Sequence, residues 1–230
     1  MKKTFLSVIT NLCTPYMYKS RCLFFTLLFV CSFCSAQDDW KLRVDKDGIR
    51  VFTRKVADSK LNTIKVESSF AATLSKFVAV ILDVNSGDQW LYSTRSSSLI
   101  KQVSPSELFY YSEIGFPWPV ANRDFVAHLS ASQDPVTKTV TIKATNIEGM
   151  VPEKKGIVRM THSTGRWTIV AKAKNLLSVE YLLEADPAGS LPAWLINSLD
   201  TKGPFETFKK LKEQVEKPVY TSAHLPFIVD

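Results

Sequence analysis

The chain has 230 residues, of which 45% are hydrophobic, enough for one domain with a full core. Its formal net charge is +7, but the first 36 positions hold four basic and no acidic residues, so the remainder carries only +3. The densest basic run, at 209–212, has the pattern of a solvated helix face. These features argue against nucleic-acid binding, which needs clustered positive charge.

The N-terminus has the pattern of a secretory signal peptide. Lys19 and Arg21 precede an apolar run at 22–31, and small residues follow up to Ala36. The run is shorter than the roughly 20 residues that span a bilayer, although a retained anchor is the alternative. We therefore expect residues 1–36 to be a signal peptide. The protein would then be exported, to the periplasm of a Gram-negative host and otherwise secreted. All four cysteines lie in this segment, so the mature protein would contain no thiol.

From residue 37 onward, alternating polar and apolar residues predict strands joined by short turns. We expect strands at 49–54, 61–70, 107–114, 123–132, 137–145, 157–163, 166–171 and 176–185. The exception is 74–83, whose apolar residues recur at helical spacing. A turn is expected at 163–165, and the serines at 96–98 are interpreted as a solvated loop. Consecutive strands without intervening helices predict an antiparallel sheet.

A helix is expected near the C-terminus, with Ser190 as its N-cap and Pro192 in its first turn. Leu191, Leu195 and Leu199 recur at helical spacing. Gly203 and Pro204 should interrupt the helix, and an apolar stripe then continues to residue 215. A curved sheet covered by one long amphipathic helix is an α+β architecture. The sequence gives no role to the tail, 218–230.

Five segments of the chain resemble the START family, the steroidogenic-acute-regulatory-protein-related lipid-transfer domains. They are Trp40 with 45–54, Trp90, 117–125, 151–159 and 186–197, and they occur in family order. The resemblance implies a START-like lipid-binding domain at 37–217, from a bacterial exported member of the family. It implies a helix-grip fold, in which a curved antiparallel sheet wraps around a long C-terminal helix and encloses an apolar cavity. The expected partner is one hydrophobic small molecule, such as a sterol or phospholipid, with transient membrane contact.

The resemblance also suggests where a ligand could bind. Glu113 falls where some members bury an acid, but the position of their partner arginine is Leu129. Glu113 should therefore have another partner, be protonated or face water, because an unpaired buried carboxylate is costly. The candidates for the cavity and its lid are Glu113, Trp118, Arg159, His162, Leu191, Trp194, Leu195 and Leu199. Candidate moving parts are the break at 203–204 and the loop 149–156.

We expect binding and not catalysis, with no cofactor and no metal. The chain has no H-x-x-x-H, no G-x-S-x-G and no glycine-rich phosphate loop. The alternatives are an enzyme on the same architecture and a sensor whose ligand controls docking. An enzyme would need titratable groups that converge in the cavity, and the nominees are Glu113, Asp124, Arg159 and His162.

Overall fold

The computed structural model describes residues 39–56 and 62–230, so the expected signal peptide lies outside the described residues. Residues Trp40–Asp230 form one compact unit. Its strands are β1 (Lys41–Lys46), β2 (Ile49–Lys55), β3 (Asn62–Phe70), β4 (Thr94–Ser104), β5 (Glu107–Ile114), β6 (Asn122–Gln133), β7 (Val140–Asn146), β8 (Ile157–Arg159), β9 (His162–Ala173) and β10 (Leu176–Asp186). Its α-helices are α2 (Leu74–Leu82), α3 (Gly87–Trp90), α4 (Ala193–Asp200) and α5 (Lys202–Val215), with short 3₁₀ helices η2 (Val84–Ser86) and η3 (Pro218–Tyr220).

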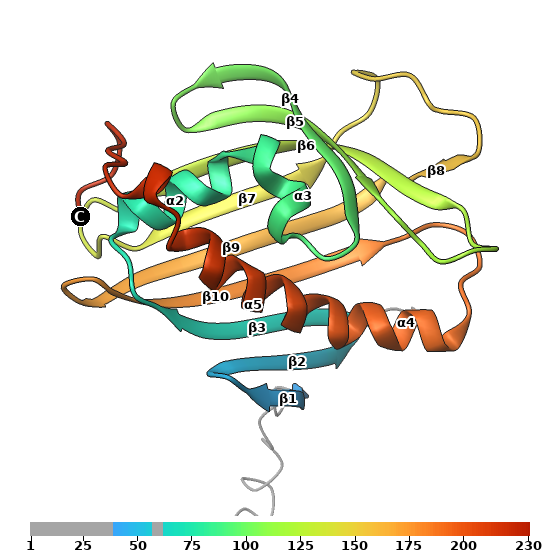
Figure 1. Cartoon of the computed structure of the whole chain (residues 1–230), viewed down its shortest axis with the longest axis horizontal. Coiled ribbons are helices and arrows are strands. Elements are labelled where there is room, and N and C mark those ends of the chain that lie inside the picture. Colours follow the sequence, from blue (N-terminus) through green and yellow to red (C-terminus); the bar gives the residue numbers. More distant parts are fainter. Residues whose placement is uncertain (1–38, 57–61) are drawn as a thin grey trace, which may run out of the picture. The chain divides into compact units, whose positions relative to one another are not determined.

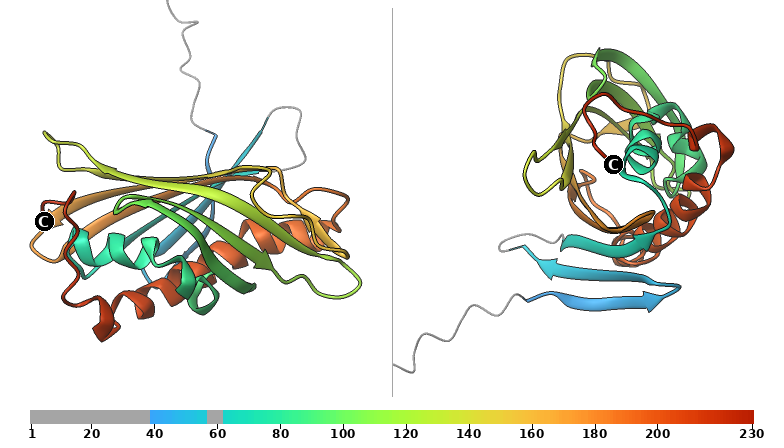
Figure 2. Two further views of the ribbon diagram at one scale, coloured as in Figure 1. Left: turned by 90° about the horizontal axis from the view of Figure 1, so that it is seen from above. Right: turned by 90° about the vertical axis from the view of Figure 1, so that its left-hand side faces the viewer.

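The strands of this unit form a single sheet in the order β1-β2-β3-β10-β9-β7-β6-β5-β4. All neighbours in this order are antiparallel, and the short β8 adds a parallel pairing to β6. The sheet curves, and α2, α3 and α5 lie on its concave face (Figures 1 and 2). The predicted helix-grip architecture is therefore confirmed. No helix of residues 39–56 and 62–230 is long and apolar enough to cross a bilayer.

Aromatic side chains fill the concave face where α2 and α5 cross the sheet. Phe208 of α5 stacks on Trp167 of β9, with ring centroids 5.5 Å apart, and Trp167 stacks on Tyr181 of β10 at 4.2 Å. Phe77 of α2 meets Phe70 edge to face at 4.8 Å. Aromatic rings bury more area per residue than aliphatic side chains, so this cluster carries much of the hydrophobic stabilisation.

The C-terminal helix differs in two details from the prediction. It begins at Ala193 and not at Ser190, because Pro192 has extended backbone angles (φ −61°, ψ 144°). Leu191 therefore precedes the helix. The break falls at Thr201 (φ −127°, ψ −65°), two residues before Gly203. The reason is still Pro204, which has no N–H to donate to the carbonyl of Asp200 four residues earlier.

Two further expectations are wrong. Residues 96–98 are not a loop but part of the edge strand β4, which pairs with β5 in spite of three irregularities in register. An edge strand exposed on both faces shows no clear polar–apolar alternation, so its sequence looks like a loop. Residues 163–165 are not a turn, because β9 runs through them and pairs with β10 and β7 on its two sides.

The segment 218–230 packs onto the same unit. The Tyr220 hydroxyl donates to Asp83 Oδ2 at 2.7 Å and accepts a hydrogen bond from Gln214 Nε2 at 3.0 Å. The Asp230 carboxylate accepts from the backbone N–H of Ser75 at 2.7 Å, in the first turn of α2, where a negative charge is favoured. With Ile228 buried in the core, the segment closes the α2 end of the concave face.

Candidate functional site

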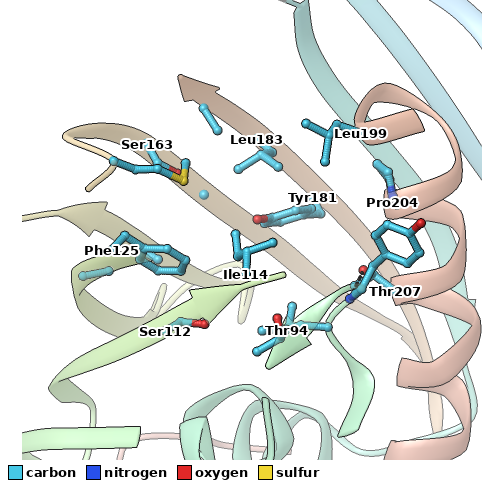
Figure 3. Close-up of a pocket in the computed structure, with 18 of the residues that line it drawn as sticks. Thr94, Ser112, Ile114, Phe125, Ser163, Tyr181, Leu183, Leu199, Pro204 and Thr207 are labelled. Atoms are coloured by element: carbon cyan, nitrogen blue, oxygen red, sulfur yellow. Dashed lines mark hydrogen bonds between the residues drawn. The ribbon is translucent and has the colours of Figure 1, made fainter. Parts of the chain in front are cut away.

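A cavity of about 210 Å³ lies between the sheet and the helices α4 and α5 (Figure 3). Inward-facing residues of β4, β5, β6, β7, β9 and β10 line it. The lining residues are Leu91, Tyr92, Thr94, Tyr110, Ser112, Ile114, Phe125, Ala127, Ala144, Asn146, Met160, Ser163, Gly165, Tyr181, Leu183, Ala185, Leu199, Gly203, Pro204, Thr207 and Phe208.

The cavity exists because small residues occupy successive inward positions on four strands. Ala127 of β6, Ala144 of β7, Gly165 of β9 and Ala185 of β10 all line it. Ala144 and Gly165 are register partners, and Leu183 pairs with Gly165 on its other side. Two residues further along the same strands, the inward positions are held by the register partners Ile142 and Trp167, whose buried side chains fill the space. Side-chain volume alone therefore switches the concave face from packed to hollow.

Two tyrosine hydroxyls are among the polar groups of this wall. Tyr110 of β5 is only 9% exposed, and the half-buried Tyr181 of β10 points its hydroxyl into the cavity (Figure 3). Within the described part of the chain, neither hydroxyl has a hydrogen-bond partner. Several other polar side chains of the cavity wall do have one. Burial raises the pKa of both phenols, so both stay protonated at neutral pH.

Gly165 allows Tyr181 to take this position. A Cβ atom on Gly165 would come within 2.9 Å of the Tyr181 hydroxyl oxygen, closer than such atoms approach in proteins. The ring itself is held from behind by its stack on Trp167. The glycine is therefore needed for the close approach of the phenol to β9.

No Asp, Glu, Lys, Arg or His is among the described residues that line the cavity. The polar lining atoms belong to hydroxyl groups and to the amide of Asn146, whose Nδ2 donates to the Met160 carbonyl at 2.7 Å. Among the described residues, no cluster of three or more His, Cys, Asp and Glu side chains could hold a metal ion. The arrangement can hold apolar surface and meet a neutral polar group.

The structure places the lid candidates in different environments. Leu199 lines the cavity, whereas Leu195, one helical turn earlier, is 5% exposed and is not among the lining residues. Leu191 is half-buried ahead of the helix. Trp194 and Trp118 are exposed, by 58% and 93%, and neither lines the cavity. Of these lid candidates, only Leu199 is among the described residues that line the cavity.

Glu113 and Arg159 lie on the other face of the sheet. Side chains alternate along β5, so Ser112 and Ile114 line the cavity and Glu113 points away from it. Glu113 accepts a hydrogen bond from Asn122 Nδ2 at 3.0 Å and lies 3.7 Å from Lys154 Nζ. It thus has other partners in place of the missing arginine, which is one of the three outcomes expected from the sequence.

Arg159 forms a buried ion pair with Asp124, its register partner between β8 and β6. The guanidinium donates from Nε to Oδ1 at 2.7 Å and from Nη2 to Oδ2 at 3.1 Å. The Asp124 carboxylate raises the pKa of this guanidinium further. Arg159 also donates to the carbonyls of Val151 and Pro152, at 3.0 and 3.3 Å. The pair therefore fastens the loop 149–156 onto the outer face of the sheet.

Arg123 is buried but does not pair with its neighbour Asp124. Its guanidinium donates to the carbonyls of Ala121, Pro187 and Ala188, and so ties the start of β6 to the turn after β10. His162 is exposed on the outer face, with its Nδ1 2.9 Å from the Thr161 hydroxyl. It lines a neighbouring groove with Glu184 and Asp186, and this groove shares Asn146, Ser163 and Ala185 with the cavity wall. The nominees for catalysis thus do not converge in the cavity.

The sequence reasoning missed most of the cavity wall. The missed residues are the two tyrosines Tyr110 and Tyr181, the small residues of the strands, and Asn146. A usable signal was present in the strand pattern: alanine or glycine at apolar positions near one end of several strands. Such residues leave space on a face where neighbouring positions carry large side chains.

A curved antiparallel sheet that closes with a C-terminal helix around an apolar cavity defines a helix-grip fold with an internal cavity. The START domain family model matches residues 27–220, and the chain belongs to this family. The recognition made from the five sequence segments is confirmed.

Relatives and solved structures agree with this assignment. An uncharacterized protein of Pseudomonas aeruginosa is 32% identical over 180 residues, which cover 78% of this chain and 88% of that protein. The bovine phosphatidylcholine transfer protein is 26% identical over 162 residues, 69% of this chain and 75% of that protein. The crystal structure of a STAR-related lipid transfer protein from Xanthomonas axonopodis has a TM-score of 0.72 at 33% identity, covering 78% of this chain and all of the other.

Proposed function

We propose that this protein binds one hydrophobic small molecule in the cavity beneath α4 and α5 and transfers it between membranes, without turnover. The observation that carries the proposal is the hollow, uncharged concave face bounded by Ala127, Ala144, Gly165 and Ala185. Lipid-transfer proteins among its relatives support the ligand class. Each buried methylene contributes about 0.8 kcal/mol, so a chain of ten carbons would supply on the order of 8 kcal/mol before the costs of ordering.

The lining supports binding over catalysis, since its polar groups are hydroxyls and one amide. The Asp124 carboxylate, a nominee for catalysis, is instead held by Arg159 on the outer face. Alanine at His162 should therefore leave ligand affinity unchanged, because its side chain is exposed outside the cavity.

Two exposed tryptophans support membrane contact as part of this function. Trp118 lies in the β5–β6 connection, four residues after the lining residue Ile114, and Trp194 lies in the first turn of α4. Both are near the helix and strand ends that border the cavity. Indole rings favour the membrane–water interface, where the ring is partly buried and its N–H stays solvated.

Export remains part of the proposal, based on the N-terminal pattern. The mature chain should then begin near Gln37 and carry no cysteine. N-terminal sequencing of protein isolated from its host tests this, and a chain that begins at Met1 would contradict it.

The function is tested by extracting bound small molecules from protein purified from its host and identifying them by mass spectrometry. A stoichiometric lipid that is absent from a variant with a filled cavity, Ala144→Leu, would support the proposal. A folded protein that carries no lipid and binds neither a fluorescent sterol nor a fluorescent acyl probe would overturn it.

Transfer is tested separately from binding with fluorescent lipid in donor and acceptor vesicles of zwitterionic phospholipid. Serine at Trp118 should slow transfer several-fold while affinity in solution stays the same. Equal transfer rates for this variant and the unaltered protein would remove Trp118 from the membrane contact.

A further inference from the structure

The polar atoms of the cavity wall indicate which class of ligand the cavity can bind. This inference rests on the proposed function. A hydroxyl that faces a cavity without a partner in the protein can hydrogen-bond to a ligand, and a ligand that covered it without pairing with it would lose free energy. Tyr110 and Tyr181 line the same cavity, and neither hydroxyl has a hydrogen-bond partner among the described residues. Burial raises the pKa of the Tyr181 phenol most, and the charge of an ionised Tyr110 would raise it further.

The wall around these hydroxyls offers no charge to a ligand. The described lining residues include no basic side chain for a phosphate or carboxylate and no acidic side chain for an ammonium group. The charged side chains nearby form ion pairs on the outer face of the sheet: Glu113 with Lys154, and Asp124 with Arg159. A charged head group inside this cavity would lose its hydration without a counter-ion, which is strongly unfavourable.

The dimensions of the cavity favour a compact ligand. Its volume of about 210 Å³ lies below the range of roughly 300–1,000 Å³ that is usual for small-molecule pockets. The aromatic stack of Tyr181, Trp167 and Phe208 closes the cavity toward α2. At the other end, the cavity adjoins the groove that contains His162. A cavity of this volume fits one compact ligand.

We infer that the cavity takes a compact, uncharged lipid with one hydroxyl or carbonyl group, and that Tyr110 and Tyr181 bind that group as the specificity-determining residues. Each phenol can donate one hydrogen bond and accept another, so an alcohol or a carbonyl oxygen can be met by both. A hydrogen-bonding pocket rejects an analogue that lacks the polar group, because the pocket's own polar atoms are then left unpaired.

The test is a series of ten-carbon ligands that displace the uncharged fluorophore N-phenyl-1-naphthylamine from the purified full chain. 1-Decanol should compete about 3- to 10-fold better than decane at equal aqueous activity, the usual value of one hydrogen bond. Didecanoylphosphatidylcholine should compete more weakly than either. Decanoate should compete better at acidic pH, where it is neutral, than at pH 8.

Matched variants assign the effect to the tyrosines. Tyr181→Phe and Tyr110→Phe should each reduce the preference for decanol over decane about 3-fold or more. Tyr111→Phe is the control, because it removes a hydroxyl from the next residue of β5, which is not among the lining residues. It should leave the preference unchanged.

The outcomes separate this inference from the proposed function. If decanol and decane compete equally and the phenylalanine variants change nothing, the cavity binds lipid but the inference is wrong. If the phosphatidylcholine competes best, the ligand class is wrong and its head group is held outside the cavity. If no ligand in the series competes and no fluorophore binds to the folded protein, the proposed function itself fails.

Discussion

The two ends of the concave face differ although the same strands and the same helix build both. Toward α2, the inward positions of the strands carry Ile142 and Trp167, and Phe77 of α2 packs against Trp167; all three are buried. Tyr220 and Ile228 of the terminal segment 218–230 belong to the same core cluster. Toward α4, the inward positions carry Ala144 and Gly165, and the space stays open. Backbone pairing is continuous from one end to the other.

This difference separates stability from function within one sheet. The packed end provides the dense contacts that hold the fold, since close-packed aromatic groups contribute most to the free energy of unfolding. The hollow end gives up such contacts, and a bound ligand can provide them. Substitutions at the two ends should therefore differ in kind, with loss of stability at one and loss of affinity at the other.

The largest effect is expected at the packed end. Phe77→Ala should lower the free energy of unfolding by about 3–5 kcal/mol, because the fully buried ring contacts Phe70 and Trp167 and would leave a cavity. Urea unfolding followed by tryptophan fluorescence measures this. A loss below about 1 kcal/mol would mean that the packed end is not the main source of stability.

Next in size is the pair of leucines one turn apart on α4. Leu195→Ala should cost about 2–5 kcal/mol of unfolding free energy, since this side chain is buried outside the cavity. Leu199→Ala should cost the ligand-free protein much less, because Leu199 already borders open space, and it should weaken the binding of a fluorescent acyl probe. Unfolding free energy and probe affinity are measured for both variants. Equal stability losses with unchanged affinities would show that α4 is only core.

A smaller effect is expected from filling the hollow end. Gly165→Ala places a Cβ within 2.9 Å of the Tyr181 hydroxyl, so the phenol must shift into the cavity. We expect probe affinity to fall about 10-fold, while unfolding free energy changes by about 1–3 kcal/mol, as is typical of overpacking. The double variant Gly165→Ala with Tyr181→Phe removes the clashing oxygen and should recover part of the affinity. No recovery would mean that Tyr181 is not what the glycine accommodates.

The smallest effect concerns Asp200, at the junction of α4 and α5. Burial raises the pKa of this carboxyl, although Asn62 Nδ2 donates to it at 2.5 Å and Arg43 favours its charge. A raised pKa means that the folded state binds the proton more tightly than the unfolded state does. This contribution to stability is therefore full below the unfolded pKa, near 3.9, and is lost as pH rises through the folded pKa.

Asp200→Asn removes the buried charge and keeps an acceptor for Asn62. The variant should be more stable than the unaltered protein at pH 7, by less than about 1 kcal/mol, and the gain should shrink toward pH 3. Unfolding free energies at the two pH values measure it. A variant that is less stable at pH 7 and equally so at pH 3 would show that the carboxylate is favoured in place.

The strand pattern was readable from the sequence wherever one face of a strand is buried. The strand at Glu107–Ile114 was predicted with its observed bounds, and most of the others within a few residues, because alternation reflects a buried and a solvated face. The two edge strands β1 and β4 were missed, since both faces of each strand are largely exposed and no alternation marks them. Local pattern thus predicted the sheet but not the full extent of its edge.

The sequence by itself determined the family, the antiparallel sheet and the presence of an interrupted C-terminal helix. The tertiary structure decided which inward-facing residues meet open space. Leu195 and Leu199 carry the same side chain and lie one helical turn apart, yet of the two only Leu199 lines the cavity. Glu113 and Tyr110 share a strand but point to opposite faces, and Gly165 is important because Tyr181 of the neighbouring strand lies across it. Such contacts join residues far apart in the chain, and the periodicity of a single segment reports only its own faces.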